Sequence, residues 1–102
     1  MCGAPPQDEQ LDRTLPASVD PATATILQGR VVRDGDPVAA AYVRLLDPNG
    51  DFTAEVVSSA TGVFRFFATP GSWTIRALAP GASGQASVEA GVGFTETTVT
   101  VS

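Results

Sequence analysis

Apolar and polar side chains alternate in several short stretches between residues 27 and 101. A period of two is typical of strands that bury one face and expose the other. The alternation predicts a hydrophobic core made of Leu27, Val31, Ala41, Val43, Leu45, Phe64, Phe66, Trp73, Ile75, Ala77, Thr97, Val99 and Val101.

Turn signals separate these stretches at intervals of about 9 to 15 residues, each long enough for one short strand. Glycine supplies positive φ in such turns, and proline presets φ near about −65°. The signals are Asp34–Pro37, Asp47–Gly50, Thr61–Gly62, Thr69–Gly71, Pro80–Gly81 and Gly91–Gly93. The last one lacks the further glycine and helix of a nucleotide-binding fingerprint, so we interpret it as a turn. The spacing predicts an all-β sandwich of about seven antiparallel strands.

Residues 38–46 also fit a helix, with Val38, Ala41, Tyr42 and Leu45 on one stripe. Because Pro37 precedes this stretch and Pro48 follows it, a helix would have barely two and a half turns. The strand-like neighbours on both sides favour a strand.

Composition changes near residue 22. The first 22 residues hold four of the eight prolines and four acidic residues against Arg13 alone. Such a segment buries too little apolar surface to offset its ordering entropy, so we expect a flexible acidic leader over 1–22 and a sandwich domain over 23–102. Leu11, Leu15 and Val19 recur every four residues, and the alternative is that they dock the leader onto the domain.

The charged residues restrict the possible functions. The chain has 11 acidic residues and 6 basic ones, with a net charge of −5, and it contains neither Lys nor His. Imidazole bases, His-dependent nucleophiles, ordinary zinc sites, Schiff bases and P-loop lysines are therefore excluded. An acidic chain also binds nucleic acid or anionic membranes poorly, and no apolar run approaches the ~20 residues of a membrane span. We expect a soluble, cytoplasmic protein without a cofactor that is not an enzyme.

From about Ile26 to Val101 the chain resembles the carboxypeptidase-regulatory-like domain, a transthyretin-type sandwich of seven strands. The likeness lies in Leu27–Val38, Ala41–Leu45, Thr61–Phe66 and Pro70–Ala77. Two enzyme groups that use this type of fold do not fit. Hydroxyisourate hydrolases rely on histidines, and intradiol dioxygenases need His and Tyr iron ligands, of which only Tyr42 is available.

The whole chain resembles a small actinobacterial family of unknown function whose members are called sulphur-metabolism protein SseC. This likeness lies in Met1–Gly3, Thr14–Asp20, Phe52–Val57, Phe64–Ala68 and Pro70–Thr74. It implies a link to sulphur metabolism through association with thiosulfate sulfurtransferases, and it transfers no catalytic residue. We therefore expect an accessory or interaction module with a sulfurtransferase as a possible partner. The alternative is a generic structural or small-anion-binding sandwich.

Four charged residues, Arg44, Glu55, Arg65 and Arg76, fall on outward-facing positions of neighbouring segments. They could form a polar patch for a carboxylate or a small oxyanion such as thiosulfate. The competing interpretation is a set of cross-strand salt bridges on a solvated sheet face, worth about 0.2–1 kcal/mol per pair.

Two further patterns have structural explanations. Asp47, Asn49 and Asp51 have the spacing that opens a calcium loop, but Phe52 stands where the loop glycine belongs and Ser58 where the closing Glu belongs. A hairpin turn explains the same residues. Trp73 and Tyr42 could form a sugar-stacking platform, but Trp73 is in phase with the core positions and Tyr42 faces the other way.

Cys2 is the single cysteine. Near the N-terminus of a polar leader it should be exposed, and a neighbouring α-ammonium group after methionine removal would lower its thiol pKa. A reactive thiol there could act as a sulphur carrier. The alternative is an incidental thiol without a role.

Overall fold

The computed structural model describes residues 15–20 and 22–102. Within this part of the chain there is no helix, and the all-β prediction is confirmed. The eight strands are β1 (Thr25–Arg33), β2 (Asp36–Pro37), β3 (Tyr42–Leu46), β4 (Phe52–Val57), β5 (Val63–Ala68), β6 (Gly71–Ala79), β7 (Ala82–Ala90) and β8 (Gly93–Thr100). Residues 42–46 form the strand that was favoured over a helix.

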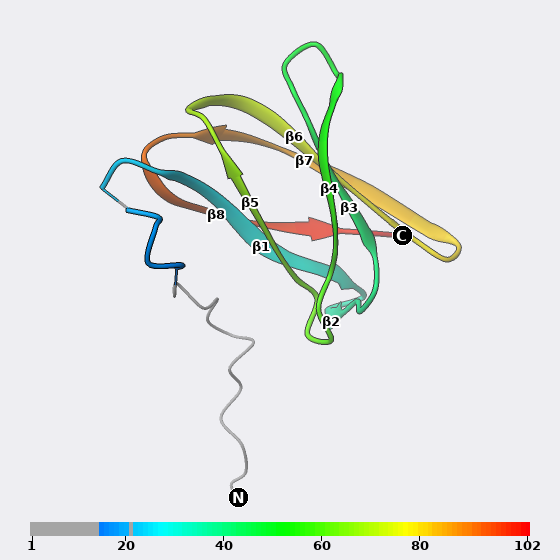
Figure 1. The fold of residues 1–102 in the computed structure, drawn as a ribbon. Coiled ribbons are helices and arrows are strands. Elements are labelled where there is room, and N and C mark those ends of the chain that lie inside the picture. The colour runs from blue at the N-terminus through cyan, green and yellow to red at the C-terminus, as the bar shows by residue number, and fades with distance from the viewer. Residues whose placement is uncertain (1–14, 21) are drawn as a thin grey trace, which may run out of the picture.

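The strands form two four-stranded sheets that pack face to face (Figure 1). In the first sheet, β1 pairs on one side with β5 and the two-residue β2, and on the other side with β8. The second sheet has the order β4-β3-β6-β7, and its β3–β4 hairpin extends beyond the rest at the top of Figure 1. One pair departs from the antiparallel expectation, because β8 runs parallel to β1 over residues 25–32.

The core lies between the sheets and contains most of the predicted positions. Phe64 and Phe66 lie on β5 with their ring centroids 6.1 Å apart. Two predictions need correction, because Trp73 and Thr97 are half-buried and not fully buried. Trp73 lies at the border of the core, where its indole Nε1 donates a 2.8 Å hydrogen bond to the carbonyl of Thr69. An indole needs such a partner, which holds this ring near the surface.

Gly29, on the inner face of β1, allows a close approach of β8. A Cβ at this position would lie 1.8 Å from the carbonyl oxygen of Thr97 and 2.9 Å from the ring of Phe64. Any side chain at position 29 would push β8 or the Phe64 ring away. The parallel β1–β8 pair therefore depends on a residue without a side chain here.

The chain crosses from the first sheet to the second between β2 and β3, and Ser58 holds this connection. The buried hydroxyl of Ser58 donates to the carbonyl of Val38 at 2.7 Å and accepts from the backbone N–H of Ala41 at 2.8 Å. One side chain thus satisfies two backbone groups that have no ladder partner there.

Tight turns lie where the sequence predicted them. Asp34 and Gly35 join β1 to β2 with φ values of 53° and 85°, which a type I′ hairpin turn requires. Pro80 and Gly81 join β6 to β7, and the φ of Gly81 is 70°. Gly91 and Val92 connect β7 to β8, which confirms that this segment is a connection.

Residues 15–20 and 22–24 form hydrogen-bonded turns before β1. Val19 N–H donates to the carbonyl of Pro16 at 2.9 Å, and Ala24 N–H donates to the carbonyl of Asp20 at 2.8 Å. Leu15 and Val19 are half-buried. This end of the predicted leader therefore contacts the domain, while Leu11 lies outside the described residues. No helix in the described part of the chain could cross a membrane.

We expect Gly29→Ala to lower the free energy of unfolding by about 3 kcal/mol, because the added Cβ forces β8 away from β1. Gly91→Ala is the matched control, since nothing lies within 4 Å of a Cβ at position 91, and it should change stability by less than about 0.5 kcal/mol. Urea denaturation measures both. Equal effects of the two variants would contradict the close approach.

Ser58→Ala should cost about 1–3 kcal/mol, because it leaves the Ala41 N–H and the Val38 carbonyl without their buried partner. Ser87→Ala, at an exposed position of β7, provides the comparison and should be nearly neutral. Thermal unfolding of both variants tests this, and an unchanged midpoint for Ser58→Ala would show that water replaces the hydroxyl without loss.

Candidate functional site

The outer face of the β4-β3-β6-β7 sheet brings three of the four predicted patch residues into one row. Arg44 on β3 lies directly opposite Glu55 on β4 and opposite Arg76 on β6. Arg76 in turn lies opposite Gln85 on β7. Since directly opposite residues project on the same side of a sheet, the row Glu55–Arg44–Arg76–Gln85 crosses all four strands.

The two arginines of this row have different partners. Arg44 Nε donates to Glu55 Oε2 at 2.7 Å, and the two side chains are 44% and 33% exposed. Arg76 donates through Nε and Nη2 to Gln85 Oε1, at 3.3 Å and 3.2 Å. Among the described residues, Arg76 therefore has an amide partner and no carboxylate. The salt-bridge interpretation holds for Arg44, and the guanidinium of Arg76 is available to an anion.

Apolar side chains lie beside this row, two residues along the strands. Tyr42 on β3 is 55% exposed and lies opposite Val57 on β4, which is 57% exposed, and opposite Leu78 on β6. Tyr42 projects from the outer face, whereas the half-buried Trp73 packs against the core. The two aromatic residues therefore form no joint platform for a sugar. We call Tyr42, Arg44, Glu55, Val57, Arg76, Leu78 and Gln85 the outer-face patch.

Arg65 is not part of this patch, which corrects the prediction. It lies on β5 in the first sheet, opposite Gln28 of β1, and its Nε donates to Gln28 Oε1 at 2.9 Å. Gln28 Nε2 donates to Glu96 Oε2 on β8 at 3.1 Å. The alternation of the sequence places Arg65 outward correctly, but it does not tell which of the two sheets the strand joins.

The Asp47 loop is the β3–β4 hairpin turn and not a calcium loop. Asp47 Oδ1 accepts hydrogen bonds from the backbone N–H groups of Asn49 and Asp51, both at 2.9 Å. This carboxylate oxygen therefore binds its own loop, as in an Asx turn. Within residues 15–20 and 22–102, no three side chains of His, Cys, Asp or Glu lie close enough together to hold a metal ion.

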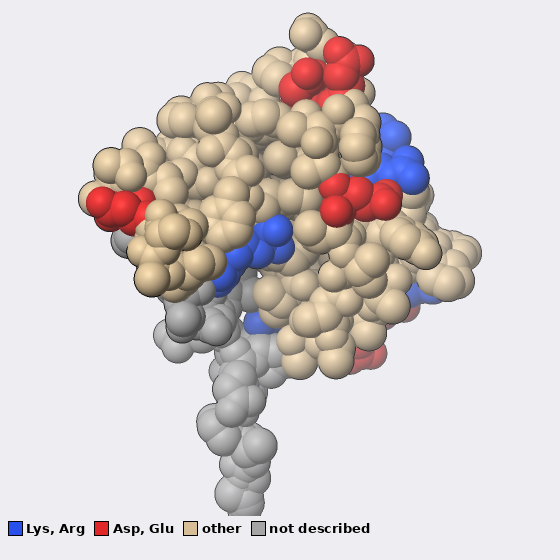
Figure 2. Space-filling model, in the orientation of Figure 1, with Lys and Arg blue, Asp and Glu red and all other residues tan. Residues whose placement is uncertain are grey.

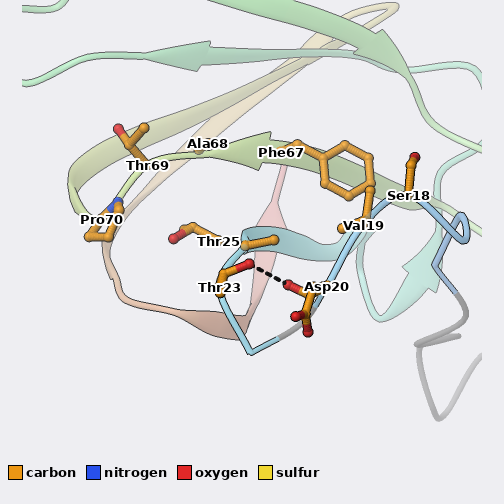
Figure 3. A pocket seen from close by; sticks show the side chains of 10 residues that line it. Ser18, Val19, Asp20, Thr23, Thr25, Phe67, Ala68, Thr69 and Pro70 are labelled. Carbon is orange, nitrogen blue, oxygen red and sulfur yellow. Dashed lines mark hydrogen bonds between the residues drawn. The ribbon is translucent and has the colours of Figure 1, made fainter.

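A pocket of about 340 Å³ opens between the turns before β1 and the β5–β6 connection (Figure 3). Its lining residues are Ser18, Val19, Asp20, Thr23, Ala24, Thr25, Phe67, Ala68, Thr69 and Pro70. None of these residues is basic, so the pocket does not fit the predicted oxyanion. Thr25 is 3% exposed, and its hydroxyl has no hydrogen-bond partner among the described residues.

Cys2 lies outside the described residues, so the sulphur-carrier role stays a prediction. Figure 2 shows that charged side chains are few on the face in view and stand in small separate groups. Sequence reasoning missed Gln85, Val57 and Leu78 as members of the outer-face patch. The sequence marks these three residues only by the alternation of their strands, which places them on the outward side.

Comparison with known proteins gives a family without an assigned activity. A family model described as "Protein of unknown function (DUF1416)" matches residues 2–101. Two Mycobacterium tuberculosis proteins, named uncharacterized protein Rv0814c and Rv3118, are each 53% identical over 103 residues, which are 99% of this chain and of each relative. An uncharacterized protein of Mycolicibacterium smegmatis is 52% identical over 89 residues, which cover 85% of this chain and 99% of that protein. None of these descriptions mentions sulphur.

One solved structure supports the fold. A DUF3823 family protein from Parabacteroides merdae matches with a TM-score of 0.64 and 19% identity over 79% of this chain. The chain spans about half of that protein, 47% of its length. At this identity the likeness shows the fold alone.

A double-mutant cycle of Arg44→Ala and Glu55→Ala should give a coupling energy of about 0.2–1 kcal/mol, because the pair is half exposed and solvent screens it. The coupling should decrease in 1 M NaCl, where the Debye length falls to about 3 Å. Equilibrium unfolding of the wild type, the two single variants and the double variant measures this coupling energy. A coupling above about 2 kcal/mol, unaffected by salt, would mean that the pair is buried in solution.

Proposed function

Since the chain belongs to the family described as "Protein of unknown function (DUF1416)", we propose its role from its own surface: it is a non-enzymatic interaction module. In this proposal the outer-face patch docks a segment of a partner protein that presents a carboxylate next to apolar side chains. The observation that carries the proposal is the position of Arg76 beside Arg44, in a row with a single carboxylate.

The charges of the row favour an anionic group. Two guanidinium groups face one Glu55 carboxylate, so the row has a net charge of about +1 on a protein whose total charge is −5. Guanidinium donors form charge-assisted, often bidentate hydrogen bonds with carboxylates. Because the whole chain is acidic, the attraction acts only at contact distance, within a Debye length of about 8 Å.

The apolar part of the patch favours a protein segment over a free anion. Tyr42 and Val57 are more than half exposed, and a small anion would leave both in water. Tyrosine and arginine are the residue types that most often dominate the energy of protein interfaces. A carboxylate with an apolar neighbour would use both halves of the patch.

The size of the face indicates a weak complex. Three inter-strand spacings of about 4.8 Å, along a nine-residue strand, give a flat area on the order of 400 Å². A standard stable interface buries about 800 Å² on each partner. We therefore expect transient binding with a Kd on the order of micromolar.

The composition and the exposure of the patch favour binding over catalysis. The chain has no His and no Lys, and the patch offers no nucleophile next to a base. Its charged groups lie on an open sheet face, whereas electrostatic catalysis acts in sites that exclude water. Recognition of a partner can use the same charged residues on an open face, because it does not require a site that excludes water.

The resemblance to proteins called SseC makes a thiosulfate sulfurtransferase the first partner to test. The two alternatives predict different results with the same reagents. A small-anion-binding domain would bind thiosulfate alone at the outer-face patch. A sulphur carrier would gain about 32 Da on Cys2, one sulphur atom, when the enzyme and thiosulfate are both present.

The test is an NMR titration of the ¹⁵N-labelled full chain with the purified sulfurtransferase of the same organism. We expect amide shifts at Tyr42, Arg44 and Arg76, and a Kd raised about tenfold or more by Arg76→Gln, since a charge-assisted hydrogen bond contributes about 1.5–3 kcal/mol. Arg33→Gln, the same change at an exposed position of β1, should leave the Kd unchanged.

Shifts that map to the other sheet, or equal affinity of Arg76→Gln and wild type, would contradict the proposed surface. Sodium thiosulfate alone is titrated in parallel. If it shifts the same amides with the same Arg76 dependence, the small-anion function replaces the interaction module.

A further inference from the structure

The sandwich is closed along one side and open along the other. On the closed side, Ser102 exchanges backbone hydrogen bonds with Ser83, so the end of the chain covers part of the edge of β7. On the open side, β4 ends the second sheet, because it pairs with β3 and no described strand lies on its other side. Such an edge strand presents backbone donors and acceptors that have no ladder partner.

The phase of the ladder shows which backbone groups of β4 lie at this edge. Ser58 N–H donates to the carbonyl of Ala41 at 2.9 Å, so Ser58, and in the same phase Val56, directs its backbone groups toward β3. Alternate residues of an antiparallel strand direct these groups to opposite sides. Glu55 and Val57 therefore direct theirs away from β3. Both residues are exposed, and nothing in residues 15–20 and 22–102 pairs with these backbone groups.

The edge of β4 lacks the features that usually keep such strands apart. Edge strands often carry Lys or Pro, and β4 has neither. Its single charged residue, Glu55, is paired with Arg44 at 2.7 Å, and Phe52 and Val57 are both more than half exposed. Short segments of high β-propensity and low net charge without Pro tend to pair with copies of themselves. A register shift at the Phe52 end leaves Ala54–Val57 as the regular part of the edge.

We propose that β4 pairs antiparallel with the β4 strand of a second copy of this chain, about a two-fold axis at Val56. The new ladder has to join the outward backbone groups of Glu55 and Val57. A register with Glu55 opposite the same residue of the second copy would bring like charges together, which is unfavourable. With the axis at Val56, each Glu55 lies opposite Val57 of the other copy, and the regular part of both edges is used.

The side chains of β4 agree with this occupant. Val56 lies on the inner side of the strand and packs against the core at its open border. At the axis the two Val56 residues form a non-hydrogen-bonded pair, with Cα atoms about 4.5 Å apart, so their side chains cover one another. A two-fold contact uses the same surface on both copies, so the assembly closes at two chains.

The dimer involves the edge of β4 and leaves the outer face of its sheet open. It therefore goes beyond the proposed function, because it needs no partner protein and its test contains none. Since β4 also carries Glu55 and Val57 of the outer-face patch, pairing would place two such patches on one continuous sheet. A partner with two matching segments would then bind with a higher overall affinity than a partner with one.

The contact is small. It supplies about four backbone hydrogen bonds and a short row of side chains, well below the ~800 Å² that a standard interface buries on each partner. We therefore expect a weak dimer with a Kd on the order of 100 micromolar.

Sedimentation equilibrium of the full chain between about 10 micromolar and 1 millimolar tests the dimer. Reductant is present throughout, because a disulfide between two Cys2 residues would also join two chains. The average mass should rise from that of one chain toward that of two. A chain that is still monomeric at about 1 millimolar would overturn the proposal, and growth beyond two copies would overturn the two-fold closure.

Opposite charges at position 57 test the register. Val57→Lys would face Glu55 of the other copy with an opposite charge and Val57→Glu with a like charge, and the symmetry makes each change act twice. We expect the dimer Kd of Val57→Glu to exceed that of Val57→Lys by about tenfold. Val92→Lys and Val92→Glu are the matched controls, because Val92 is 60% exposed in the β7–β8 connection, and their Kd values should differ less than about twofold. Equal ratios at the two positions would overturn the register.

Amide hydrogen exchange locates the contact independently of any substitution. The N–H groups of Glu55 and Val57 should exchange about threefold more slowly at 1 millimolar than at 50 micromolar chain, the change in monomer fraction that a Kd of about 100 micromolar gives. Exchange at Val92 should be the same at both concentrations. A sample that sediments as a dimer without slower exchange at Glu55 and Val57 would place the contact elsewhere and overturn the pairing of β4.

Discussion

A hydrogen atom in place of a side chain at position 29 lets the first and last strands of the domain lie together. The carbonyl of Thr97 and the ring of Phe64 occupy the space that a Cβ would need. This approach fixes β8 beside β1, and β8 in turn carries Val99 into the core. The chain then continues to Val101 and Ser102, and Ser102 exchanges backbone hydrogen bonds with Ser83 of β7. The chain after β8 thus joins the two sheets along one side. The register of β8 against β1 is fixed by the same approach.

The two outer faces differ in how far their side chains are exposed to water. On the β4-β3-β6-β7 sheet, Tyr42 and Val57 stay exposed, and the charged row lies in water. On the β5-β1-β8 sheet, Ile26 and Gln28 are removed from water completely. On the first sheet the burial is confined to the middle strand β1, since Phe67 on the neighbouring β5 is 52% exposed. In our proposed function, the open face serves recognition of a partner.

The sequence predicts the strands with strong alternation, because Val, Ile, Leu and Phe mark the buried phase clearly. On β7 it names no core position, since the inward residues are mostly Ala and Gly, which carry little hydrophobic signal, and only the turn signals on either side mark this strand. It places Arg44, Glu55 and Arg76 on outward positions correctly, yet it groups Arg65 with them. Alternation fixes the side of a strand that a residue occupies, but pairing between distant strands decides which sheet that side belongs to. The burial of Gln28 has no local signal, because its hydrogen-bond partners, Arg65 of β5 and Glu96 of β8, lie on strands that are distant in the sequence.

The parallel pair of β1 and β8 also determines when the domain can form in a cell. Among the described strands a ribosome makes β1 first and β8 last, so one side of β1 has no partner until β8 has been made. Such an unpaired strand edge can associate with other chains. Contacts between residues so far apart in the sequence also form slowly, because the chain must close a long loop first. The first sheet is therefore completed only once β8 has been made, and a chain that stops before β8 would have an open edge along β1.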